Sequence, residues 1–101
     1  MGAVRWTQHA ERDLRDIYEF IKHDSPRAAQ STVDRLVEAG DRLSMFPERG
    51  RIVSEYPELG YREIIVGSYR LIYRCEGDAA WITSVIHGRR RVNGEPGRLG
   101  G

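Results

Sequence analysis

The sequence contains a single cysteine, Cys75, which excludes an internal disulfide and a cysteine-based zinc site. Its place within an apolar stretch predicts a small buried side chain rather than a reactive thiol, and one cysteine is typical of a reducing compartment. No apolar run approaches the ~18 residues that a membrane helix needs, and residues 1–6 show no apolar signal region. We therefore expect a cytoplasmic protein with no membrane partner.

Lysine is almost absent as well. Lys22 is the only lysine, and the other fifteen basic residues are arginine, whose planar guanidinium groups suit phosphate or carboxylate partners. The net charge of +1 favours no particular partner, but the charge is unevenly distributed. Residues 1–60 carry a balance of −2 and residues 61–101 a balance of +3. Any cationic surface is thus expected in the second half of the chain.

Two amphipathic helices are expected in the first half. Thr7 is a suitable N-cap, and an apolar stripe at helical spacing follows it to residues 23–24. Ser25 before Pro26 signals a second helix, which continues to residues 45–47. Gly40 is unfavourable inside a helix, so we expect it where the two helices pass closely. The helices should form an antiparallel hairpin.

The other apolar segments predict strands. Residues 4–6 form a short first strand, residues 48–60 a loop, and runs at 61–66, 69–75 and 81–87 a three-stranded antiparallel meander with tight turns. A meander is stable only when its apolar face is covered. The fold class is therefore predicted as α+β, with a sheet of about four strands covered by the helical hairpin, and Trp6 and Trp81 in the core. Residues 1–92 are expected to form one domain, and residues 93–101 a flexible tail.

Arginines recur on one face of the central predicted strand. Alternation places Arg70, Ile72 and Arg74 on the same side, and Arg62 and the run 89–91 could extend a basic patch there. Such a patch could bind phosphate through bidentate contacts. The alternative is that these arginines are only solvated, or paired with nearby acidic residues.

His87 ends the last predicted strand beside three arginines. It is a candidate general base, although a histidine at a strand end is more often structural. His9 and His23 lie at helix ends, and the spacing of the three histidines fits no metal motif. No glycine-rich phosphate loop is present. We therefore expect neither a metal nor a cofactor.

Three segments resemble one known family. The sequence reads FPERGR at 46–51, YRE at 61–63 followed by VGSYRLIYR at 66–74, and VIHGRR at 85–90. In this order, with a strand and a helical hairpin before them, they resemble the RelE/ParE superfamily of type II toxin–antitoxin toxins over about residues 3–92. The resemblance implies the same α+β fold and two possible activities.

The RelE-like branch of this superfamily cuts mRNA on the ribosome, and the ParE-like branch poisons DNA gyrase. For a nuclease, the resemblance would assign catalysis to Arg62, Arg70, His87 and Arg90. No tyrosine follows Arg90, however, Ile64 stands where RelE has a lysine, and the chain is only mildly basic. We therefore favour the ParE-like branch, with no catalytic residue. The expected target contacts are then Arg70, Arg74, His87, Arg89, Arg90 and Arg91.

A toxin of this superfamily also implies a cognate, ParD-like antitoxin in a hetero-oligomer. Such an antitoxin would lay a helix and an extended tail over the toxin. The expected contacts are on the two helices and the first strand of the meander: Leu14, Tyr18, Val33, Leu36, Val37 and Arg62. Two alternatives stay open, a ribosome-dependent endoribonuclease and a non-toxic relative that only binds an antitoxin.

Overall fold

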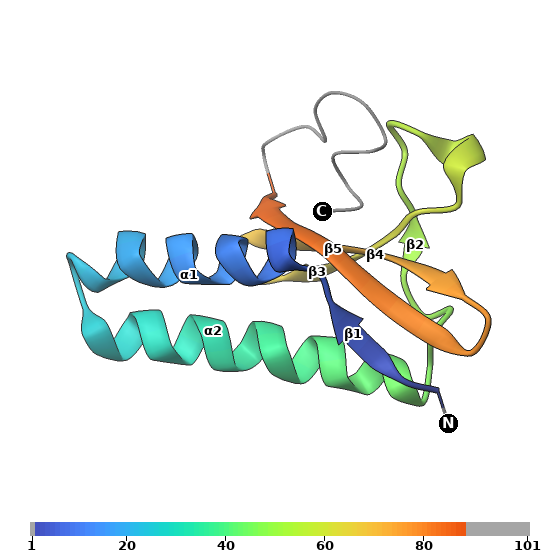
Figure 1. Cartoon of the computed structure of the whole chain (residues 1–101). Coiled ribbons are helices and arrows are strands. Elements are labelled where there is room, and N and C mark those ends of the chain that lie inside the picture. The colour runs from blue at the N-terminus through green and yellow to red at the C-terminus, as the bar shows by residue number, and fades with distance from the viewer. Residues whose placement is uncertain (1, 89–101) are drawn as a thin grey trace.

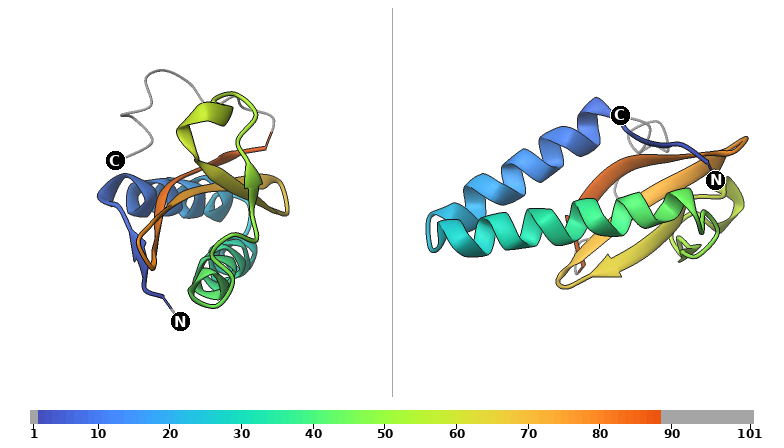
Figure 2. Two further views of the ribbon diagram at one scale, coloured as in Figure 1. Left: turned by 90° about the vertical axis from the view of Figure 1, so that its right-hand side faces the viewer. Right: turned by 90° about the horizontal axis from the view of Figure 1, so that it is seen from below.

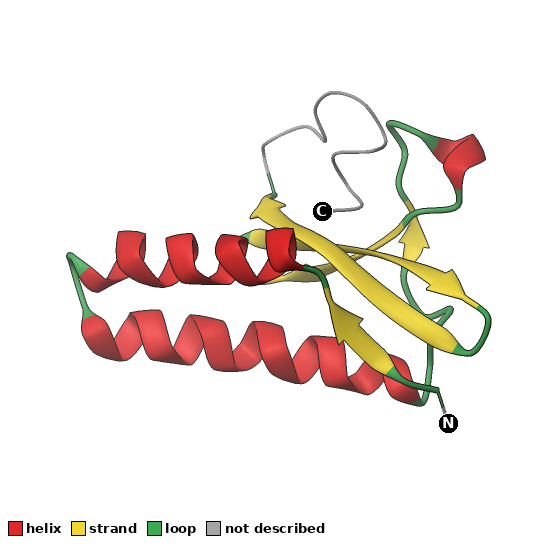
Figure 3. Cartoon of the chain, in the orientation of Figure 1, coloured by secondary structure: helices red, strands yellow, loops and turns green. Residues whose placement is uncertain are grey.

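Helices and strands occupy separate parts of the chain in the computed structural model, which describes residues 2–88. The elements follow in the order β1 (Val4–Trp6), α1 (Gln8–Lys22), α2 (Pro26–Asp41), η1 (Arg42–Ser44), β2 (Arg51–Ile52), η2 (Pro57–Leu59), β3 (Arg62–Val66), β4 (Tyr69–Glu76) and β5 (Ala79–His87). Figure 3 shows the helical hairpin and the strands side by side. The α+β class is confirmed. The expected tail at 93–101 lies outside the described residues.

The helix boundaries follow from capping. The hydroxyl of Thr7 accepts a hydrogen bond from the backbone N–H of Ala10 at 3.1 Å, and Ser25 caps α2 in the same way through Ala28. Each cap satisfies a donor that the first turn of a helix leaves unpaired, which contributes about 1 kcal/mol. Neither helix within residues 2–88 is long and apolar enough to cross a membrane.

The sheet has five strands in the order β1-β5-β4-β3-β2. The meander β3–β4–β5 is antiparallel as predicted, whereas β1 pairs with β5 in parallel, so the sheet is mixed rather than antiparallel throughout. The loop predicted at 48–60 contains β2, which pairs with β3. Both turns of the meander begin with a glycine of positive φ, Gly67 and Gly77, as type II′ turns require.

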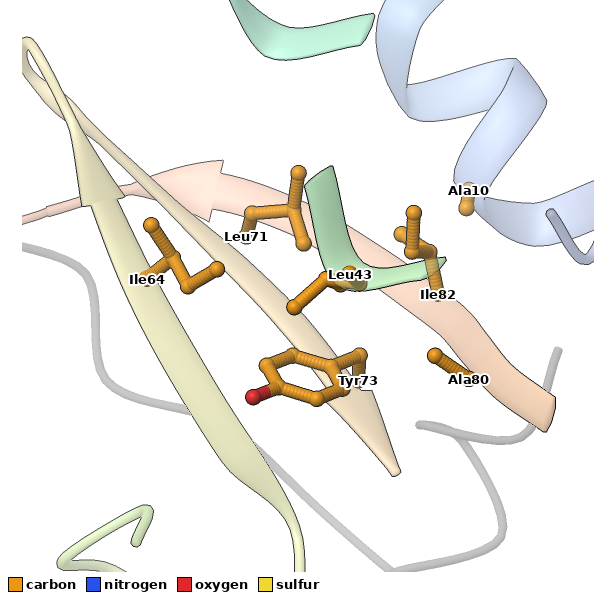
Figure 4. Packing of buried hydrophobic residues seen from close by; sticks show 7 residues of the cluster. All are labelled: Ala10, Leu43, Ile64, Leu71, Tyr73, Ala80 and Ile82. Carbon is orange, nitrogen blue, oxygen red and sulfur yellow. The ribbon is translucent and has the colours of Figure 1, made fainter. Parts of the chain in front are cut away.

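The main core lies between the helices and one face of the sheet (Figures 1 and 2). Leu43 of η1 packs with Ile64, Leu71 and Tyr73 of β3 and β4, and Leu43 and Tyr73 are 1% and 0% exposed. Figure 4 shows Leu43 pointing from η1 toward the strands. Full burial of each such side chain contributes ~1.5–3 kcal/mol. The hairpin therefore supplies the cover that the meander needs.

One irregularity in β5 decides which residues face this core. The register with β4 shifts between Ile72 and Tyr73, whose partners are Ser84 and Ile82. Thr83 is thus the extra residue of a β-bulge, and its hydroxyl donates to the carbonyl of Ile72 at 3.3 Å. The bulge lets Ile82 and Val85, three positions apart, both pack toward the helices.

Two expectations about packing are wrong. Gly40 does not mark a close approach of the two helices, since a Cβ there would lie 2.7 Å from Ile82 and 2.8 Å from Trp6, which belong to the sheet. Trp81 is not a core residue. It is half-buried outside the core clusters, with the Arg5 guanidinium 5.9 Å from its ring, whereas Trp6 does pack against the core.

Candidate target-binding surface

Arg70 lies near the start of β4 and is only 7% exposed. Its Nη1 and Nη2 donate to the two carboxylate oxygens of Glu55, both at 2.9 Å, and its Nε donates to Glu63 at 2.7 Å. The bonds to Glu55 raise the pKa of Arg70 more than burial lowers it, and Glu63 adds to the rise. The expectation that the sheet displays Arg70 to a partner is therefore wrong.

The segment that covers Arg70 consists of residues 53–61, here called the covering segment. Figure 1 shows it, with η2, on the side of the sheet away from α2. The N–H of Val53 donates to the carbonyl of Tyr61 at 2.9 Å, which closes the segment into a loop. Val53 and Tyr61 are buried with Ile72 of β4, so this face of the sheet has a small core of its own. The face is thus neither wet nor open at Arg70.

The other predicted basic residues do not join Arg70. Arg62 shares its face with its partner Tyr73, opposite to Arg70, and its Nη1 donates to the backbone carbonyl of Gly50 at 2.8 Å. Arg74 is exposed and pairs with Glu76 at 3.4 Å. Arg89, Arg90 and Arg91 lie outside the described residues. Within residues 2–88 the arginines therefore form no continuous cationic face of the kind expected.

His87 lies instead on a groove between α1 and the end of the sheet, here called the Phe20 groove after Phe20, Tyr69 and His87, which line it. It consists of two adjoining cavities of about 490 and 320 Å³ that share these three residues. The rings of Tyr69 and His87 meet edge to face with their centroids 5.7 Å apart. Phe20 is 75% exposed. A largely exposed aromatic ring beside a groove is typical of a protein contact.

The wall of the Phe20 groove is tied to the sheet. Asp13 of α1 accepts a hydrogen bond from the backbone N–H of Val85 at 2.8 Å, and His9 lies 3.5 Å from the same carboxylate oxygen. Ile17 and Val85 form the apolar floor, and Asp16 adds a carboxylate to the rim. The groove therefore suits a partner that offers an apolar side chain and has a positive charge beside it.

Comparison with known proteins assigns the fold to a family. A sequence profile described as "ParE toxin of type II toxin-antitoxin system, parDE" matches residues 4–92. The chain belongs to this family. It is thus a toxin of the RelE/ParE superfamily, as the sequence motifs suggested, and the resemblance is confirmed.

Curated relatives of this ParE-family chain carry names from both branches. It is 35% identical to Toxin RelE2 of Caulobacter vibrioides over 89% of its own length and 99% of that protein. It is 33% identical to Putative toxin Y4kP of Sinorhizobium fredii over 87% of its length and 90% of that protein. Toxin ParE3 of Caulobacter vibrioides is 26% identical over 97% of this chain and 98% of its own.

Solved structures show the same fold. A chain of the chromosomal ParDE system from P. aeruginosa superposes with a TM-score of 0.73 at 24% identity, covering 86% of this chain and 96% of that one. A chain of the toxin–antitoxin complex RelBE2 from Mycobacterium tuberculosis does so with a TM-score of 0.61 at 31% identity, covering 85% and 96%. Both were solved as parts of toxin–antitoxin systems.

The residues expected to contact an antitoxin are not all accessible in this ParE-family toxin. Leu36 is 0% exposed and packs with Ile17 and Val85, so its predicted place on a binding surface is wrong. The other helical residues of that set are half-buried: Leu14, Tyr18, Val33 and Val37. They stay candidates for that contact.

Sequence reasoning missed Glu55 and Phe20. Glu55 stands in a segment without periodicity, and nothing local shows that it reaches Arg70, fifteen positions later. Phe20 did leave a signal, because it is a large apolar residue on a helix whose apolar stripe runs through Ile17 and Ile21. Cys75 was also misplaced. It is exposed, and its thiol donates to the carbonyl of Pro47 at 3.3 Å.

Proposed function

We propose that this toxin stops growth by binding DNA gyrase in the cytoplasm, without a catalytic step, and that a cognate, ParD-like antitoxin neutralises it in a hetero-oligomer. The observation that supports this is the burial of Arg70. A nuclease would need this guanidinium group for the phosphate at the cleaved bond, but here two carboxylates already bind all three of its nitrogens.

The rest of the nuclease set is also dispersed. Arg62 is bonded to backbone carbonyls on the opposite face, while His87 lies at the Phe20 groove. General acid–base catalysis requires a group within hydrogen-bond reach of the reacting atoms and a site that stabilises the developing charge. The described residues offer His87 no such charged neighbour that faces the groove except the carboxylates Asp13 and Asp16, which would repel a phosphodiester.

The Phe20 groove suits a protein target better than a nucleic acid. Interfaces gain most of their energy from a few aromatic or arginine anchors beside a pocket. Phe20 and Tyr69 are such anchors, and the groove lies where β5 ends and the chain continues to Arg89, Arg90 and Arg91. We assign target contact to Phe20, Tyr69 and His87, and propose that the three arginines contribute to it.

The test is to induce the full chain in cells, map mRNA 5′ ends, and assay supercoiling by purified gyrase with the purified toxin. We expect growth arrest, inhibited supercoiling and unchanged mRNA ends. Cuts phased to codons with gyrase untouched would reject the proposal and favour the endoribonuclease, a reading that the relative named RelE2 keeps in view. Absence of growth arrest would favour a non-toxic relative that only binds an antitoxin.

A matched variant separates the two activities. His87→Ala should reduce gyrase inhibition only modestly, because His87 is one of several contacts. A nuclease that uses His87 as acid or base would lose ~10²–10⁴-fold in rate with the same change. Co-purification with the small protein encoded beside this gene, and rescue of growth by it, would test the antitoxin.

A further inference from the structure

Strand β3 has an open edge. β2 pairs only with its first two residues, and no strand within residues 2–88 pairs with 64–66 on that side. The two-residue turn after Val66 closes directly on the pair Val66–Tyr69, so Val66 and Ile64 direct their backbone groups toward β4. Ile65 consequently directs its N–H and C=O toward the open edge. Such an edge is a template for a further strand.

A cationic groove runs beside this edge. It has a volume of about 310 Å³ and lies between α2 and β3. Arg35, Ala39 and Arg42 follow each other at helical spacing along one wall, and Arg49 adds a third guanidinium group. Arg42 is bonded to Glu38 at 2.7 Å, whereas Arg35 and Arg49 form no ion pair with any residue that the structure describes. Two positive charges are therefore available to a partner.

We infer that this edge binds an extended, acidic peptide segment of a partner protein as an additional strand. The backbone of the segment would pair with Ile65. Because side chains alternate along a strand, every second residue of the segment would face Arg35, Arg42 and Arg49, and the residues between them would lie beside Ile65, which is 51% exposed. The favoured pattern is thus acidic and apolar residues in alternation.

A peptide fits these features better than a nucleic acid does. A phosphate backbone would use the arginines but leave the N–H and C=O of Ile65 and its exposed side chain without partners. An added strand uses all three, since main-chain hydrogen bonds give affinity and alternate side chains give specificity. The inference does not depend on the cellular target, because the groove shares no lining residue with the gyrase contacts proposed above.

The test is titration of the full chain with a peptide of about ten residues that alternates glutamate and valine. The controls are the lysine–valine peptide and a single-stranded RNA of similar length. We expect the glutamate peptide to bind and to protect the Ile65 amide from hydrogen exchange. Equal binding of the lysine peptide, tighter binding of the RNA, or no binding of the glutamate peptide would each overturn the inference.

Variants locate the site. Arg35→Glu with Arg49→Glu should weaken binding of the glutamate peptide at least about tenfold, whereas Arg12→Glu with Arg27→Glu, the same change of charge elsewhere on the helices, should change it little. Ile65→Pro removes only the outward N–H and should abolish binding, while Ile65→Thr keeps that N–H and should retain it. Thermal unfolding checks that each variant folds, and if Ile65→Pro does not, the arginine pairs decide.

Discussion

Arg70 grips both carboxylate oxygens of Glu55 with two parallel hydrogen bonds of 2.9 Å, which join strand β4 to the covering segment. A second carboxylate, Glu63, lies between the guanidinium groups of Arg70 and Arg51. Glu63 is only 4% exposed, so this cluster is largely removed from water. Its charges are balanced, two positive and two negative. A buried cluster of this kind depends on every member.

Arg70→Met should therefore destabilise the protein. The change leaves Glu63 buried with one partner, the exposed Arg51, and removes the attachment of Glu55, so we expect a loss of ~3 kcal/mol in the free energy of unfolding. Chemical denaturation measures it. Arg74→Met on the same strand is the matched control, because that arginine is exposed, and should change stability by less than about 0.5 kcal/mol. Similar losses for both variants would contradict the buried cluster.

Tyr73→Phe should reduce stability by about 1–2 kcal/mol. The hydroxyl accepts a hydrogen bond from the N–H of Gly50 at 2.8 Å and donates one to the carbonyl of Pro47 at 2.8 Å. The phenylalanine ring would still fill the core, so the loss reflects the two hydrogen bonds alone. Tyr56→Phe, in a partly buried ring of the covering segment, serves as a control for the loss of a tyrosine hydroxyl in general.

Stability should also fall in alkali, and Tyr73 should account for part of the fall. Burial raises the pKa of Tyr73 above its ordinary value of 10.0, so the folded state holds this proton more tightly than the unfolded chain does. The contribution is fully present below pH 10 and is lost as the pH rises through the higher folded pKa. Partial desolvation raises the pKa of the Cys75 thiol in the same direction, beginning near 9.0. Denaturation curves of Tyr73→Phe should therefore show a shallower decline above pH 10, and an unchanged decline would refute this role.

Gly40→Ala should destabilise the protein although alanine favours helices by about 1 kcal/mol over glycine. The added Cβ would lie 2.7 Å from Ile82 and 2.8 Å from Trp6, and forcing an extra carbon into a packed core costs ~1–3 kcal/mol. Pairing the change with Ile82→Val, which removes the contacting methyl group, should restore part of the loss. Thermal unfolding of the single and double variants provides the measurement.

Phe20→Ala should abolish gyrase inhibition while leaving the fold intact. Because Phe20 is 75% exposed, its removal should change the melting temperature little, but an anchor of this kind contributes ~2 kcal/mol or more to binding, about thirtyfold in affinity. Phe46→Ala is the matched control, since Phe46 is 60% exposed but lies away from the Phe20 groove. Equal effects of the two changes on supercoiling assays would argue against the groove as the contact.

Local signals predicted most of the fold. The caps at Thr7 and Ser25, the apolar stripes and the glycine turns all act over a few residues, so the helices and the meander could be placed from sequence. The bulge at Thr83 and the parallel pairing of β1 could not, because both depend on partners far along the chain.

The candidate site was less accessible to prediction for the same reason. Alternation correctly put Arg70 and Arg74 on one face, but whether that face is open depends on residues 53–61, which follow no period. The fate of Arg70 was therefore decided by Glu55, a residue that gives no local indication of its role.

The pairing of β1 with β5 has a consequence for how the toxin is made. Thr7 is bonded to the backbone of Ile82 and Thr83, so the beginning of the chain is fixed only by residues near its end. During synthesis the first strand must wait until the last one has left the ribosome, and the wall formed by α1 against β5 is incomplete until then. A nascent chain thus has no assembled groove, and the cell is exposed to the toxin only after its translation is complete.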